Sequence, residues 1–242
     1  MINYFGVILM KISFFVLLIL IFGTTIFSEA YKIEQNLDED YYQKLINRIT
    51  ILEEALENFP NNYETLVDLG IIYHDIGLEG NHDALKRAKI LFEKAKREKR
   101  QNPEIDLRYG SVLTLLGGYM WFPPARMWYV LTGVSDMKKV IEKDSDNLLF
   151  RFIRAETCYI MTEFDFCTET AINDYEYIIF RLENLEAPLE MISVCKARFK
   201  LAKSYERERK INKTIELLET IIENDCDLFY VSEARYMLSY LR

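Results

Sequence analysis

A spaced pattern of small and aromatic residues recurs along this chain, and it constrains the fold more than any other feature. In its clearest copy the pattern reads Leu66, Leu69, Gly70, Tyr73, Ala88, Phe92 and Ala95, and in its last copy Leu201, Ala202, Tyr205, Thr214, Leu218 and Ile221. Residues three and four apart share one face of a helix, so each copy predicts two helices that cross at a small residue. Such a hairpin cannot bury its apolar side alone. The pattern therefore predicts an all-α chain of stacked helical hairpins.

Two further copies lie between these, and they keep the same phase. Their inward positions are Gly110, Leu113, Gly133, Met137 and Val140, followed by Ala155, Cys158, Ala171, Tyr175 and Ile178. Fifteen residues separate Ala95 from Gly110, and fifteen separate Val140 from Ala155. The spacing inside the hairpins varies instead, which predicts that insertions lie in loops between paired helices.

Helix boundaries can be read from turn residues. A first helix over residues 41–58 should stop at Phe59-Pro60, because proline disfavours helix in the residue before it, and should act as an N-terminal cap. The Gly77–Asn81 segment should separate the first hairpin's helices, with Asn81 capping the second. Pro103 should open the next helix, and a helix over residues 229–241 should close the array.

These residues resemble tetratricopeptide repeats (TPRs), whose motif runs W-x-x-L-G-x-x-Y, then A-x-x-x-F, then A and P. The resemblance covers residues 41–242 in degenerate form, and the hairpin around residues 109–147 is similar to uncharacterised exported bacterial members. It implies a right-handed superhelical array, a TPR-like α-solenoid of about four hairpins plus capping helices in one domain over residues 31–242. It also implies a non-catalytic scaffold that holds a protein or peptide partner in a concave groove lined by the first helix of each hairpin.

The resemblance also selects groove positions. They are Glu64, Val67, Ile71, His74 and Asp75 in the first hairpin, Leu149, Phe152, Glu156, Tyr159 and Ile160 in the third, and Lys196, Phe199, Lys203, Glu206 and Arg207 in the last. Chaperone-binding members clamp a carboxylate with Lys and Asn at such positions, where this chain has Val67 and Ile71. We therefore expect a more apolar groove, with Val67, Ile71, Phe152 and Phe199 exposed to a partner.

A second candidate surface is the expected loop over Gly117–Trp128. It holds both tryptophans, Trp121 and Trp128, together with Tyr119, Met120, Phe122 and Met127. One interpretation is that these rings fill the gap left by a longer connection. The other is a binding surface, because Trp, Tyr and Met are enriched at interfaces. A pocket for a small molecule beside this loop, in an accessory protein or an enzyme, is the alternative function.

The N-terminal residues predict export. An apolar run over residues 12–22 follows Lys11 and precedes Ser28-Glu29-Ala30, which is typical of a secretory signal peptide over residues 1–30. A start at Met10 is an alternative to Met1. The expected location is periplasmic or extracellular, in the bacterial cell envelope. An uncleaved membrane anchor is the alternative, and membrane association is expected only through this segment.

Composition excludes other classes of function. The net charge is −8 at pH 7, whereas nucleic-acid binding requires cations that neutralise phosphates, so no nucleic-acid partner is expected. The basic run from Lys86 to Arg100 has the spacing of a solvated helix face, with an acidic partner or an anionic membrane as the alternative. The four cysteines, Cys158, Cys167, Cys195 and Cys226, form no Cys-x-x-Cys pair. Core thiols and disulfides both remain open for them.

No motif in the sequence indicates catalysis. A glycine-rich phosphate loop, a nucleophile elbow and a paired metal motif are all missing. The only histidines, His74 and His82, each precede an aspartate, but they lie eight residues apart across a glycine turn. We expect them to be surface polar residues at helix ends, and we expect no metal, no cofactor and no enzyme activity.

Overall fold

The structure is a computed structural model, and it describes residues 42–98, 101–184, 192–224 and 226–242. The chain divides into two compact units at Asn58 and Phe59. In the first unit, a helix covers residues 42–58 and ends before Pro60, as predicted. Its more shielded side carries Leu45, Ile49 and Leu52. The predicted leader over residues 1–30 lies outside the described residues.

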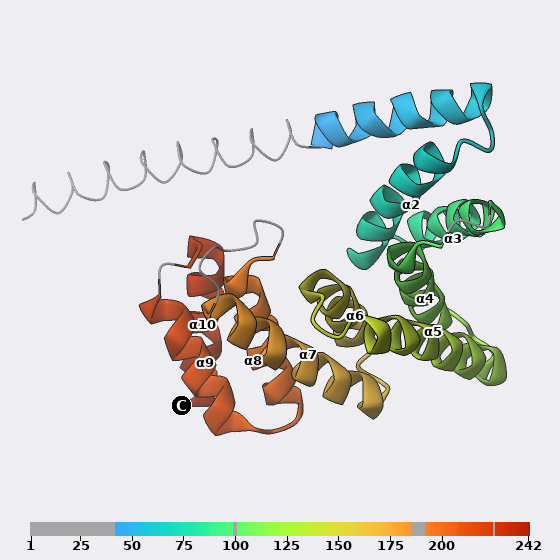
Figure 1. Cartoon of the computed structure of the whole chain (residues 1–242). Helices are drawn as coiled ribbons and strands as arrows, with labels where there is room; N and C mark the ends of the chain where they lie inside the picture. Colours follow the sequence, from blue (N-terminus) through green and yellow to red (C-terminus); the bar gives the residue numbers. More distant parts are fainter. Residues whose placement is uncertain (1–41, 99–100, 185–191, 225) are drawn as a thin grey trace, which may run out of the picture. The chain divides into compact units, whose positions relative to one another are not determined.

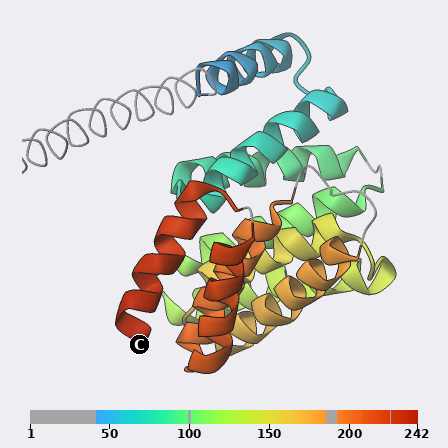
Figure 2. The same ribbon diagram turned by 90° about the vertical axis from the view of Figure 1, so that its left-hand side faces the viewer.

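The second unit is all-α in its described residues, which confirms the predicted class of a helical-repeat solenoid. Its helices pack as antiparallel pairs, α2 with α3, α4 with α5, α6 with α7 and α8 with α9, and α10 packs on the last pair (Figure 1, Figure 2). Their bounds are α2 Tyr63–Leu78, α3 His82–Arg97, α4 Pro103–Gly118, α5 Pro123–Lys143, α6 Leu148–Ile160, α7 Asp165–Glu183, α8 Val194–Arg207, α9 Ile211–Glu223 and α10 Leu228–Leu241.

Side-chain caps start the first helix of every pair. The caps are Asn62 before α2, Asn102 before α4, Asn147 before α6 and Ser193 before α8, and each accepts a hydrogen bond from a backbone N–H in the first turn. Each cap therefore satisfies a donor that the helix itself leaves unpaired. Asn81 caps α3 in the same way, as predicted, by accepting from the Ala84 N–H at 3.0 Å.

The small residues lie where paired helices approach most closely. A Cβ added to Gly110 on α4 would lie 2.8 Å from the Gly133 carbonyl oxygen on α5. A Cβ added to Gly133 would lie 2.3 Å from the Gly110 carbonyl oxygen. Ala155 and Ala202 are fully buried at the equivalent crossings of α6 and α8. The predicted register of the hairpins is thus correct.

The expected loop over Gly117–Trp128 is wrong. Helix α4 continues to Gly118 and α5 begins at Pro123, so only Tyr119–Phe122 lies outside a helix. The extra residues of this hairpin lengthen α5 to 21 residues. Proline is favoured at the first position of a helix, because its φ suits the helix and its missing N–H is not needed there. Trp128 is therefore a residue of a helix and not of a loop.

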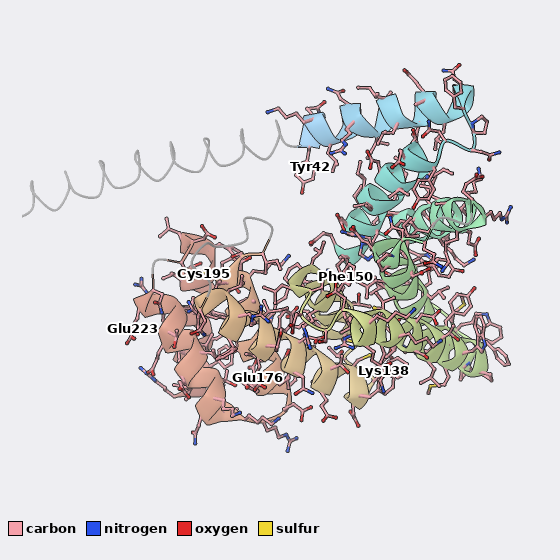
Figure 3. The ribbon with its side chains drawn as sticks, viewed as in Figure 1. Tyr42, Lys138, Phe150, Glu176, Cys195 and Glu223 are labelled. Carbon is pink, nitrogen blue, oxygen red and sulfur yellow. A yellow bond between two sulfur atoms is a disulfide. The ribbon has the colours of Figure 1, made fainter. Side chains whose placement is uncertain are left out.

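The cysteines divide into two kinds. Cys195, at the start of α8 (Figure 3), forms a disulfide with Cys226, which lies just before α10. Cys158 on α6 and Cys167 on α7 are buried free thiols. The sequence left core thiols and disulfides open, and the structure contains one pair of each kind. In the described parts of the chain, no helix has the length and apolar character needed to cross a membrane.

Candidate functional site: the groove of first helices

Two adjoining hollows lie on the side of the second unit formed by the first helices of the pairs, and we call them together the groove. The first has a volume of about 200 Å³ and is lined by residues of α2, α4, α6 and α8. The second has a volume of about 290 Å³ and is lined mainly by α6, α8 and α10. Glu79 and Lys196 line both hollows, so the two lie next to each other.

Half of the predicted site residues line this groove. Asp75, Phe152 and Glu156 line the first hollow, and Tyr159 and Phe199 line the second. Each comes from the first helix of a hairpin, because such helices lie side by side in a stacked array.

Other groove predictions are wrong in detail. Val67 and Phe199 are each only 8% exposed, so they are not free apolar surface. Phe199 packs on the core that α9 and α10 share. The repeat pattern places Phe199 on the groove side of its own hairpin, and it does not include the helix α10 that covers this side chain. His74 is fully buried and cannot touch a partner. Ile71 is half-buried on α2.

The groove is lined by charged as well as apolar side chains, so the expected apolar character holds only in part. Arg108, Lys196 and Lys200 face it together with carboxylates from α2 and α6. Sequence reasoning missed Arg108, because groove positions were carried over to three hairpins and not to the second. Arg108 lies one turn after Glu104, and its Nε donates to that carboxylate at 2.8 Å.

A buried polar network joins α2, α4 and α6 beneath the groove. Arg108 Nη1 donates to Asp75 Oδ1 at 2.7 Å and lies 2.9 Å from His74 Nδ1. His74 Nε2 lies 2.8 Å from Ser111 Oγ, and Ser111 Oγ lies 2.6 Å from Thr157 Oγ1. The Thr157 hydroxyl donates to the Ile153 carbonyl oxygen at 2.7 Å. Every hydrogen-bonding group in this chain of contacts has a partner, as burial requires.

His74 Nδ1 lies 2.9 Å from Arg108 Nη1 and 3.0 Å from Asp75 Oδ1. A guanidinium only donates and a carboxylate only accepts, so the position of the ring proton depends on which of these two contacts His74 makes.

The set Asp75–His74–Ser111 has the outline of a nucleophilic triad, but Ser111 is fully buried, so its hydroxyl does not face an open hollow. The network joins α2, α4 and α6.

Lowering the pH should destabilise the protein through His74. Burial, opposed in part by the contact with Asp75, lowers the pKa of His74 below its ordinary value of 6.5. At low pH the unfolded chain therefore binds a proton at His74 that the folded chain does not bind. The contribution of the neutral His74 to the free energy of unfolding is complete above pH 6.5 and falls as the pH drops below that value. We expect the free energy of unfolding to decrease between pH 7 and 5.5 by up to about 1.4 kcal/mol per pH unit.

Urea unfolding at several pH values measures this effect. His82 is the only other histidine, so His82→Gln is a matched control that should keep the pH dependence while His74→Gln loses it. An equal slope in His74→Gln and the unaltered protein would contradict the assignment.

Glu156 is the centre of a second buried cluster. It is 4% exposed, and its carboxylate accepts from the Tyr175 hydroxyl at 2.7 Å and from Lys200 Nζ. Lys196 Nζ lies 3.4 Å away. Burial lowers the pKa of Lys200, and the Glu156 carboxylate opposes that shift. Glu156 therefore orders two lysines at the groove rather than offering a free charge to a partner.

The tryptophans lie at the connection between α4 and α5. Trp121 is 90% exposed and Trp128 is 59% exposed, so the interpretation that these rings fill a gap is wrong for the tryptophans. Tyr119 packs back, with its ring stacked on His82 at 4.2 Å between centroids and its hydroxyl donating to the Gly80 carbonyl oxygen. Neither tryptophan lines the two hollows of the groove. They form a separate exposed apolar surface.

The exposure of both tryptophans predicts an unusual unfolding signal. Trp121 is almost fully exposed and Trp128 is more than half exposed in the folded state. Their emission maximum should therefore shift little when urea unfolds the chain, while the helical circular dichroism signal is lost cooperatively. Acrylamide should quench folded and unfolded protein to a similar degree. A large red shift on unfolding would show that the rings are covered.

The histidines are not arranged for a metal. Across the residues that the structure describes, no three His, Cys, Asp or Glu side chains are grouped so that they could hold an ion. His74 belongs to the buried network and His82 stacks on Tyr119. The expectation that both are simple surface residues is wrong for His74, because α4 and α6 cover it.

The chain is similar to a solved structure of a bacterial protein. MamA from residue 41 to its end, from Desulfovibrio magneticus RS-1, aligns with a TM-score of 0.45 and 15% sequence identity, covering 70% of this chain and 84% of that chain. No protein-family model and no curated protein matches the sequence. The helical-repeat class rests on the stacked pairs of helices and their small-residue crossings.

Proposed function

We propose that this chain is an exported, non-catalytic scaffold of the bacterial cell envelope that binds a protein partner in the groove. The observation that carries the proposal is the groove itself, where charged and aromatic side chains from five helices face an open hollow. A stacked-hairpin protein presents such a surface as a consequence of its repeat geometry. Open hollows lined by several helices suit an extended peptide segment more than a small molecule, which is usually enclosed.

The groove side chains are held in place before a partner arrives. Arg108 is anchored by Glu104 and Asp75, and Lys200 is anchored by Glu156. Ordering flexible side chains on binding costs free energy, so side chains that are already ordered favour binding. The side chain of Asp75 is 55% exposed and remains able to pair with a cation of the partner.

Export is proposed from the leader pattern of residues 11–30. The test is the intact mass of the protein recovered from the cell envelope. A mass that begins at Tyr31 supports cleavage after Ala30. A full-length mass in the membrane pellet would favour the anchored form, and protein confined to the cytosol would overturn export.

The groove is tested by capturing partners from the envelope fraction and titrating them against matched variants. Phe152 lines the first hollow and is half-buried, whereas Phe180 is 62% exposed on the outer face of α7. Phe152→Asp should weaken binding by about 30-fold, equivalent to about 2 kcal/mol for an anchor residue. Phe180→Asp should leave binding unchanged. Equal affinities for both variants, at unchanged thermal stability, would refute the groove as the site.

A further inference from the structure

Helix α8 carries a row of four cations, two of which, Lys196 and Lys200, line the groove. Lys196, Lys200, Lys203 and Arg207 follow the spacing i, i+4, i+7 and i+11, which places them on one face of the helix. The row contrasts with the net charge of −8 of the whole chain. A concentration of positive charge on one face of an acidic protein is a local feature that packing of the repeats does not require.

Each cation of this row lies over an aromatic ring. Lys196 Nζ is 5.7 Å from the Phe152 ring centroid, and Lys203 Nζ is 5.6 Å from the Phe199 centroid. The Tyr159 ring has Lys200 Nζ at 4.9 Å and the Arg207 guanidinium carbon at 4.3 Å. Rings that carry the apolar stems of lysine and arginine hold the charged groups in position.

The two halves of the row differ in their partners. Lys196 and Lys200 share the buried Glu156 carboxylate. Within the described ranges, Lys203 and Arg207 have no ion pair with a carboxylate, and Arg207 donates to the Tyr159 carbonyl oxygen at 2.9 Å. The neighbouring Glu206 accepts from the Tyr240 hydroxyl at 3.1 Å. Lys203 and Arg207 are thus positioned cations that no carboxylate among the described residues neutralises in an ion pair.

An aromatic hollow adjoins these two cations. Tyr159, Phe199, Phe229 and Tyr230 line it, so the rings under Lys203 and Arg207 are also walls of the second hollow. A ligand that pairs with the cations would place its next residues against these rings.

From the charge complementarity we infer that the groove takes an acidic peptide segment. Its carboxylates pair with Lys203 and Arg207, and an apolar side chain beside them enters the hollow between Tyr159 and Phe229. This inference rests on the proposed function, and it adds the chemistry of the partner.

The test selects peptides from a random 12-residue display library on the protein purified from cells that express the full chain. The selected peptides are then titrated against three double variants. Lys203→Glu with Arg207→Glu reverses the proposed site, and Lys203→Arg with Arg207→Lys keeps its charge. Lys94→Glu with Lys138→Glu reverses exposed charges on the outer helices α3 and α5. Circular dichroism melts verify that each variant is folded.

We expect the selected peptides to be rich in Asp and Glu around one apolar residue. Their affinity should fall at least tenfold for the reversed site and stay within about twofold for the other two variants. It should also fall as salt rises from 50 to 200 mM, since partly exposed charges are screened.

Three outcomes would overturn the inference, and they are distinguishable. The selected peptides could be neutral or basic, with an affinity that Phe152→Asp lowers and that Lys203→Glu with Arg207→Glu leaves unchanged. This result would keep the groove as a binding site and refute the acidic partner. Scrambled acidic peptides or heparin that bind as well as the selected peptides would show general polyanion binding. If no selected peptide loses affinity for the Phe152→Asp variant, the proposed function and the inference are both refuted.

Discussion

Replacing Asp174 with alanine should destabilise the protein by about 3 kcal/mol, the lower end of the range for breaking a buried ion pair. Asp174 on α7 is fully buried, and its carboxylate accepts from Arg151 Nη1 at 2.9 Å and from Arg154 Nε and Nη2 at 2.7 and 2.8 Å. The alanine variant leaves two cations of α6 without their anion. The arginine side chains keep 18% and 14% exposure, so water offsets part of the loss.

Urea unfolding at pH 7 measures the effect, with Asp136→Ala as the matched control. Asp136 on α5 pairs with the exposed Lys139 at 2.9 Å, and surface pairs of this kind contribute about 0–1 kcal/mol. A loss below about 1 kcal/mol for Asp174→Ala would contradict the view that this ion pair joins α6 to α7.

Replacing Gly110 with leucine should cost about 1–3 kcal/mol or more through overpacking. A side chain here meets the Gly133 carbonyl oxygen at 2.8 Å and the Met137 backbone nitrogen at 3.2 Å, and backbone atoms cannot rotate away as a side chain can. Helices α4 and α5 would have to separate. Even Gly110→Ala should be destabilising, although alanine is the better helix former by about 1 kcal/mol.

Gly118 supplies the control within the same helix. A Cβ there would meet only the Met161 side chain, with the sulfur at 3.3 Å, and that flexible side chain can move. Gly118→Ala should therefore change the melting temperature little, while Gly110→Ala lowers it. Equal melting temperatures for Gly110→Ala and the unaltered protein would show that the two helices are not in contact as described.

The crossings of the hairpins could be predicted because they depend on spacing alone. The small residues at the crossings share one helix face with the apolar residues three and four positions away, and a small side chain lets two helices approach closely. These small residues are Gly70, Gly110, Ala155 and Ala202. Helix ends at Pro60, Asn81 and Pro103 followed from local backbone rules in the same way. The error at residues 117–128 arose because the longer spacing inside this hairpin was assigned to a loop, although Pro123 was a start signal for a helix.

The details of the site depended on side chains from distant helices, and no spacing along the chain encodes them. His74 is buried because α4 and α6 cover it, and its hydrogen bond to Ser111 spans 37 residues. The disulfide partner of Cys195 lies 31 residues away, among three possible pairings of four cysteines.

The sequence by itself determined the helices, their pairing and the small residues at their crossings, since these follow from local periodicity. Only the tertiary structure decided which residues of the first helices are exposed. Exposure depends on what the neighbouring helices cover, as the burial of Phe199 under α10 and the exposure of Trp121 demonstrate.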